Sequence, residues 1–92
     1  MFGQMQLENF KEGNLPQKGQ SAWDGSAIKN LTGANYKALI YLGAQPVNGT
    51  LHWFIAEQTI PYAFEIRHVV KLAILERDGN YSFVKESVHE IA

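Results

Sequence analysis

Histidine and carboxylate side chains are the groups in this 92-residue chain that could hold a metal ion or move protons near neutral pH. The three histidines, His52, His68 and His89, do not stand at the H-x-x-x-H spacing that turns two imidazoles toward one metal ion. A hairpin around residues 61–64 would not place His52 opposite His68 either. We therefore interpret the three as strand histidines on a partly solvated face.

The acidic residues do not form a recognisable acid–base pair. Catalysis by two carboxylates needs both groups at a defined separation, and no pair in this sequence can be placed within reach. The acidic residues considered are Glu57, Glu65, Glu76, Asp78, Glu86 and Glu90. No serine stands in a nucleophile elbow, and no glycine-rich phosphate loop precedes a helix. The sequence therefore predicts a protein that is not an enzyme, with no catalytic residues, no metal site and no cofactor.

Composition and charge narrow the class of protein further. Hydrophobic residues make up 46% and charged residues 18%, which indicates a globular domain, and the length allows a single one over residues 1–92. The absence of cysteine excludes disulfide scaffolds, thiol catalysis and thiolate zinc sites. A net charge of −1 argues against tracking of nucleic-acid phosphates. No apolar run approaches the ~20 residues that span a membrane, and Met1–Gln20 lacks the features of a secretory signal. We expect a cytoplasmic protein with neither a nucleic-acid nor a membrane partner.

An amphipathic helix is predicted over residues 21–32. Ser21 followed by Asp24 resembles a capping box, and Gly33 is well placed to end the helix. The apolar stripe of this helix consists of Trp23, Ala27, Ile28 and Leu31. Before the helix, residues 4–10 have enough apolar content for a short strand.

Strand-like segments follow the helix. They cover residues 36–42, 51–60, 65–76 and 81–84, the last extending toward Val88. Turn-rich breaks at 43–49 and 61–64 and the tight-turn signal Asp78-Gly79 separate them. Short connections favour antiparallel pairing of successive strands, so the fold class is α+β, with one helix against an antiparallel meander.

The alternation of side chains along these strands predicts two faces. In the third strand, the apolar set is Ile66, Val70, Leu72 and Ile74, and the solvated set is Arg67, Lys71 and Arg77. Trp23, Phe54 and Phe64 are expected in the core. Trp53 is expected to point outward, where an exposed tryptophan hints at a contact surface.

The connection Gln45–Gly49 is the most informative segment, because hairpin tips display binding groups on a rigid sheet. Pro46 stiffens the tip, Val47 places an apolar side chain in a turn, and Gly49 permits backbone conformations that other residues resist. An apolar knob on a stiff tip suits insertion into a cleft at a low ordering cost.

The pattern Gln45-x-Val47-x-Gly49 resembles the Q-x-V-x-G signature of the cystatin and stefin superfamily, and Thr50 matches its common continuation. The run from Leu31 through Gln45 is similar to the helix end and second strand of small bacterial cystatin-like proteins. Asp78-Gly79-Asn80 resembles the second hairpin turn of that group. The resemblance covers nearly the whole chain and implies a cystatin-like fold, with one helix packed on a four- to five-stranded antiparallel sheet.

Cystatins use an N-terminal trunk and two hairpins as an apolar wedge that plugs the active-site cleft of papain-like cysteine proteases. The resemblance implies that this chain inhibits such proteases reversibly and places Gly3 in the trunk. The implied protease-binding residues are Gly3, Gln45, Pro46, Val47, Asn48, Gly49, Arg77, Asp78, Gly79 and Asn80.

Two features depart from the family pattern. The second hairpin lacks the Pro-Trp pair that is often found there, and only two residues precede Gly3. The alternative function is a non-inhibitory cystatin-fold interaction module, with a partner surface that includes Trp53. A domain-swapped dimer, in which the first hairpin opens and its two strands run on as one, stands beside the monomer as an oligomeric state.

Overall fold

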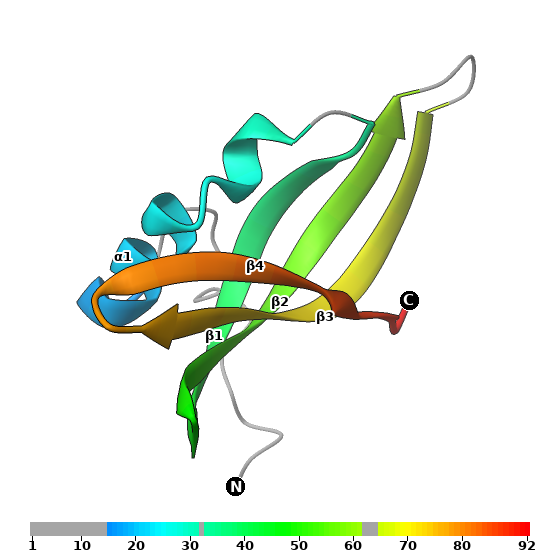
Figure 1. Cartoon of the computed structure of the whole chain (residues 1–92). Coiled ribbons are helices and arrows are strands. Elements are labelled where there is room, and N and C mark those ends of the chain that lie inside the picture. Colours follow the sequence, from blue (N-terminus) through cyan, green and yellow to red (C-terminus); the bar gives the residue numbers. More distant parts are fainter. Residues whose placement is uncertain (1–14, 32, 62–64) are drawn as a thin grey trace, which may run out of the picture.

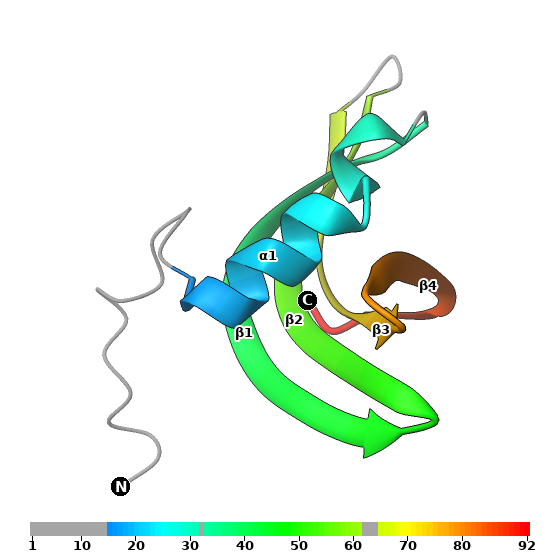
Figure 2. The same cartoon turned by 60° about the vertical axis from the view of Figure 1, so that its left-hand side comes forward.

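The computed structural model describes residues 15–31, 33–61 and 65–92. This part of the chain forms the helix α1 (Gln17–Gly25), the 3₁₀ helix η3 (Ile28–Asn30) and the strands β1 (Asn35–Val47), β2 (Gly49–Pro61), β3 (Glu65–Arg77) and β4 (Asn80–Glu90). The strands pair antiparallel in the order β1-β2-β3-β4 (Figure 1). The sheet bends around α1, which lies on its concave side (Figure 2). The α+β class, with a helix packed on an antiparallel sheet, is therefore confirmed.

The helix differs from its predicted bounds. Pro16 precedes the first helical residue and its fixed φ of −64° suits a helix start, so Ser21 lies inside the helix and the predicted capping box is wrong. The helix stops at Gly25 because the Ser26 hydroxyl donates to the Trp23 carbonyl at 2.8 Å and accepts from the Ile28 amide at 3.2 Å. These local bonds compete with helix continuation, and Ala27 takes a left-handed φ of 60° before η3 begins.

The predicted strand segments 36–42, 51–60, 65–76 and 81–84 all lie inside observed strands, and β4 runs on to Glu90. The turn-rich break predicted at 43–49 is wrong, because β1 continues to Val47 and β2 begins at Gly49. Two register shifts in the pairing with β2, between Ala38 and Ile40 and between Tyr41 and Gly43, accommodate the bend of β1. The strand considered at residues 4–10 lies outside the described residues.

The predicted turn at Asp78-Gly79 is confirmed between β3 and β4. The φ angles of 55° and 81° at these two residues are both positive, as a type I′ hairpin turn requires. An Asp-Gly pair tolerates that backbone because neither residue is β-branched and glycine has no Cβ.

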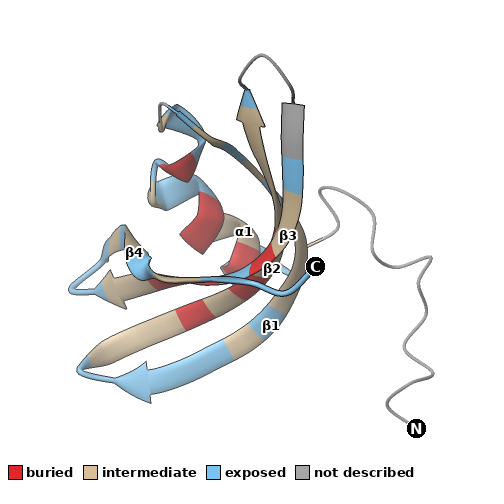
Figure 3. Ribbon diagram, turned by 90° about the vertical axis from the view of Figure 1, so that its right-hand side faces the viewer, coloured by how far each residue is buried: buried red, intermediate tan, exposed pale blue. Residues whose placement is uncertain are grey.

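The core lies between α1 and the concave face of the sheet (Figure 3). Trp23 of α1 meets Phe54 of β2 edge to face at 5.1 Å between ring centroids, and Tyr41 of β1 meets Phe54 at 5.3 Å. The buried hydrophobic cluster consists of Ala22, Trp23, Ile28, Ala38, Phe54, Ala56, Val70, Leu72 and Ile74. The predicted core positions Trp23 and Phe54 are confirmed, as are the described members of the apolar face of β3. Phe64 and the side chain of Ile66 lie outside the described part of the structure.

Candidate functional site

Two loops predicted to act together lie side by side at one end of the sheet. The register places Thr50 opposite Glu76, which brings the β1–β2 connection beside the end of β3. Arg77 donates through Nε to the carbonyl oxygen of Asn48 at 2.9 Å and joins the two loops directly. The fold therefore brings Gln45–Gly49 together with Arg77–Asn80.

The first hairpin is narrow at its tip. Val47 pairs with Gly49, so only Asn48 lies between the two strands, and Pro46 pairs with Thr50 one step below. The Val47 side chain is 48% exposed at this tip. Gly49 has a φ of 114°, and a Cβ built on it would lie 2.6 Å from the Glu76 carbonyl oxygen. Only glycine fits here without moving the end of β3.

Gln45 lies lower in the hairpin, within β1 and not in a loop. Its Oε1 accepts a hydrogen bond from Trp53 Nε1 at 2.9 Å, which holds both side chains on the face of the sheet opposite α1. The outward position predicted for Trp53 is thereby confirmed, since its strand neighbours His52 and Phe54 are buried.

The second loop presents polar groups. Arg77, Asp78, Gly79 and Asn80 are all exposed, and the guanidinium of Arg77 is engaged with Asn48. The remaining predicted site residue, Gly3, lies outside the described residues. Of the residues that the sequence analysis assigned to the site, the structure thus joins the two loops through Arg77 and Asn48.

A polar chain below the first hairpin was missed by the sequence analysis. His52 is 4% exposed, so the prediction of a partly solvated position is wrong. Its Nδ1 lies 2.9 Å from Tyr41 Oη and its Nε2 lies 2.7 Å from Glu76 Oε1. Burial, followed by the negative charge of Glu76, raises the pKa of Tyr41 above its ordinary value. These hydrogen-bonded side chains link β1, β2 and β3 at the base of the hairpin.

The other histidines do not converge on a metal site. His68 pairs with Glu90 at 2.8 Å, and His89 contacts the carbonyl of Ser87 at 3.2 Å. His52 lies opposite Ile74 and His68 lies opposite Gln58. The prediction that His52 and His68 do not face each other is therefore confirmed. Among the described residues, no group of three or more histidine and carboxylate side chains could hold a metal ion.

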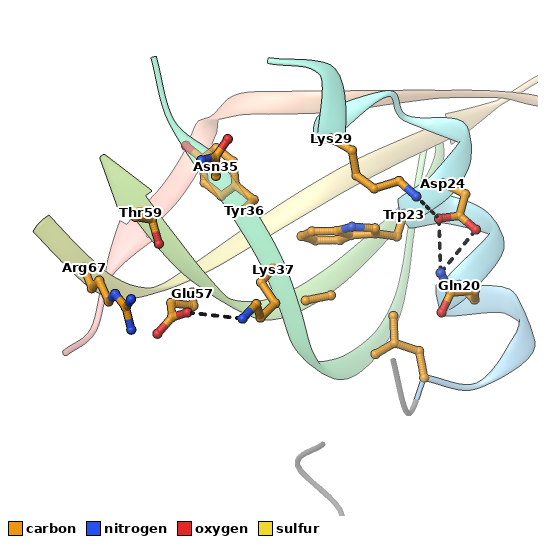
Figure 4. A pocket seen from close by; sticks show the side chains of 12 residues that line it. Gln20, Trp23, Asp24, Lys29, Asn35, Tyr36, Lys37, Glu57, Thr59 and Arg67 are labelled. Atoms are coloured by element: carbon orange, nitrogen blue, oxygen red, sulfur yellow. Dashed lines mark hydrogen bonds and ion pairs between the residues drawn. The ribbon is translucent and has the colours of Figure 1, made fainter. Parts of the chain in front are cut away.

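A cavity of about 460 Å³ opens at the edge of β1 (Figure 4). Its charged side chains are largely paired with one another: Lys29 Nζ lies 3.3 Å from Asp24 Oδ1, and Lys37 Nζ lies 3.9 Å from Glu57 Oε1. Gln20 Nε2 also donates to both carboxylate oxygens of Asp24, at 3.1 and 3.2 Å. Because these charged groups already interact with one another, fewer of them are left to bind a polar ligand, and the cavity is a weaker candidate site than the hairpins.

Comparison of the chain with protein-family models, with curated proteins and with solved structures finds no match. None of the described helices is long and apolar enough to cross a membrane. The feature of the described residues that bears most directly on function is the geometry of the hairpin end.

Proposed function

We propose that this chain is a cystatin-like, reversible inhibitor of papain-like cysteine proteases, and that the Gln45–Gly49 hairpin enters the active-site cleft. The observation that carries the proposal is the exposed Val47 side chain on a one-residue hairpin tip. The tip is held by the hydrogen bond from Arg77 to Asn48, and the backbone of Gly49 lies too close to Glu76 to leave room for a side chain.

Rigidity of the tip is what an inhibitor of this kind requires. A loop already fixed before binding loses little conformational entropy in the cleft. The residues on either side of Asn48 belong to the β1–β2 pairing, which would have to break before the tight turn could straighten into a segment that the protease can cleave. The hairpin would thus fill the cleft and dissociate from it without being cleaved.

The apolar contribution of Val47 is modest. Full burial of a valine side chain is worth about 1.5–3 kcal/mol, and Val47 still exposes about half of its surface. Burying the exposed part supplies about 1 kcal/mol, or roughly a fivefold change in affinity. The polar Arg77–Asn80 turn adds little apolar area, so the inhibition should be weaker than that of an inhibitor with an apolar second hairpin.

The second candidate function is a non-inhibitory interaction module. The polarity of the Arg77–Asn80 turn favours it, because exposed polar groups at this position suit hydrogen bonds to a partner better than insertion into an apolar cleft. A domain-swapped dimer would remove the tip, since Val47, Asn48 and Gly49 would have to straighten. Size-exclusion chromatography with light scattering distinguishes the monomer from that dimer.

A titration of papain activity with the purified monomer tests the inhibitory function. The matched variants are Val47→Asp at the tip and Ile91→Asp, whose apolar side chain is similarly exposed at 54% but follows β4 at the far end of the sheet. We expect dose-dependent inhibition by the parent and by Ile91→Asp, and its loss in Val47→Asp. Absence of inhibition by the folded parent at high micromolar concentration, or equal inhibition by Val47→Asp, would refute the proposal.

A further inference from the structure

The face of the sheet turned away from α1 is not covered by the described helices (Figure 2), and the strand registers place several apolar side chains on it. The registers place Leu51 opposite Leu75, Trp53 opposite Ala73, and Ile55 opposite Lys71 on this outer face. Leu51, Trp53, Ile55 and Leu75 are all partly exposed. Partly exposed apolar side chains that neighbour one another on the solvent side of a sheet are typical of a contact surface.

Trp53 is held in one orientation at the centre of this face. Its indole N–H is bonded to Gln45, and the Lys71 ammonium lies 4.8 Å from the centroid of its ring. A fixed aromatic side chain flanked by polar groups is characteristic of a binding anchor, because little ordering is left to occur on contact. The Trp53 side chain is therefore preorganised for contact with a partner.

A hollow of about 250 Å³ opens beside Trp53. It is lined by Leu42, Gly43, Ala44, Gln45, Trp53 and Lys71. Gly43 lies directly opposite Trp53 in the register, and a Cβ built on it would meet nothing within 4 Å. The register shift between Tyr41 and Gly43 leaves Leu42 49% exposed at the rim. The hollow is therefore open to solvent and has an apolar rim, with room for one aliphatic side chain.

The charged side chain that lines the hollow is positive, and it is Lys71. Lys71 is exposed and occupies an outward position on β3, opposite Ile55. Among the described side chains that the registers place on this face, Glu57 is the acidic one, and it pairs with Lys37. Within the described part of the chain, no carboxylate forms an ion pair with Lys71. The ammonium beside the hollow is thus available to an anion from outside.

We propose that the Trp53 hollow binds an acidic segment of a partner protein, with an apolar side chain in the hollow and a neighbouring carboxylate on Lys71. A nucleic acid fits this surface less well, because the Lys71 ammonium already lies over the indole ring on which a base would stack. The inference is independent of protease inhibition: it concerns the outer face of β1, β2 and β3, while inhibition concerns the hairpin tip.

The test uses ¹H–¹⁵N NMR of the full chain with the peptide acetyl-Glu-Leu-amide and its neutral counterpart acetyl-Gln-Leu-amide. The indole N–H of Trp53 reports on the hollow, and that of the buried Trp23 serves as an internal control. We expect millimolar acidic peptide to shift the Trp53 indole signal and the amide signals of 42–45, leaving the Trp23 signal in place. The neutral peptide should bind about threefold to fivefold more weakly, which corresponds to one partly exposed ion pair.

Two variants separate the Lys71 contact from a general charge effect. Lys71→Gln should bind the acidic peptide no better than the neutral one, whereas Lys85→Gln, which removes an exposed cation from β4, should bind like the parent. Equal binding of both peptides by the parent, or an unchanged preference in Lys71→Gln, overturns the proposal. So does a shift of the same signals by single-stranded oligothymidine but not by peptide, or by raising the protein concentration alone, which would assign the face to a nucleic acid or to a second copy.

Discussion

Replacement of Gly49 by alanine tests whether the first hairpin is held as tightly as its geometry indicates. At a φ of 114°, an alanine is in a region that costs about 1–3 kcal/mol for a residue with a side chain. The new Cβ would also lie 2.6 Å from the Glu76 carbonyl oxygen, a backbone atom that cannot rotate away. Relief requires β2 to separate from β3 at this point.

Separation at Gly49 would break the hydrogen bond from Arg77 to Asn48, which is worth about 0.5–1.5 kcal/mol. We therefore expect Gly49→Ala to lower the free energy of unfolding by about 2–4 kcal/mol. Gly79→Ala is the matched control, because Gly79 has a φ of 81° but a Cβ built on it would meet nothing within 4 Å. It should lose about 1–2 kcal/mol from backbone conformation alone.

Urea unfolding followed by tryptophan fluorescence measures both losses. A chain of this length has a total stability of about 5–14 kcal/mol, so both variants should still fold at low temperature. Papain inhibition provides the second readout: Gly49→Ala should weaken it, while Gly79→Ala should leave it nearer the parent. If Gly49→Ala proves no less stable than Gly79→Ala, the tip deforms at little cost in free energy and the hairpin is not a preformed wedge.

Three further predictions concern the base of the hairpin, the β3–β4 pairing and the helix contact. The pKa of Tyr41 is raised above its ordinary value of 10.0, so the folded chain keeps a proton that the unfolded chain loses. The free energy of unfolding should therefore fall as the pH rises past about 10. Tyr41→Phe should remove that part of the fall, as measured by urea unfolding at alkaline pH. Ser87 Oγ accepts from the Ala73 amide at 2.7 Å, so Ser87→Ala should cost about 1–3 kcal/mol in urea unfolding, against almost nothing for the exposed Ser82→Ala. Gly19→Ala should lower the thermal midpoint although alanine favours a helix by about 1 kcal/mol, because its Cβ would lie 2.9 Å from the Tyr41 ring.

The strands were predictable because their signal is local. Alternating apolar residues within 51–60 and 65–76 and the Asp78-Gly79 pair each contain the information needed to place them. The end of α1 was not predictable, since it depends on the Ser26 hydroxyl, which forms local hydrogen bonds and so prevents the backbone from continuing the helix. Two segments of similar composition can differ in whether a serine hydroxyl bonds to the local backbone, and the residue pattern does not reveal which of them does so.

The buried His52 shows a different limit. Its alternation with Phe54 and Ala56 placed it on the inner face, which was a usable signal, but a histidine is expected to seek solvent. Its burial is tolerated because Tyr41 and Glu76 satisfy both ring nitrogens. These partners lie 11 and 24 residues away in the chain, and only the register of the sheet shows that they meet.

The sequential order of the strands has a consequence for how the chain reaches its fold. Each strand pairs with its neighbour in sequence, and the β1–β2 and β3–β4 turns are tight, so hairpins can form with little loop-closure entropy. The helix α1 precedes all four described strands and leaves the ribosome before them. A nine-residue helix is not stable alone. During synthesis, Trp23 therefore cannot pack until Phe54 has been synthesised, and the helix docks only after the sheet that it covers has formed.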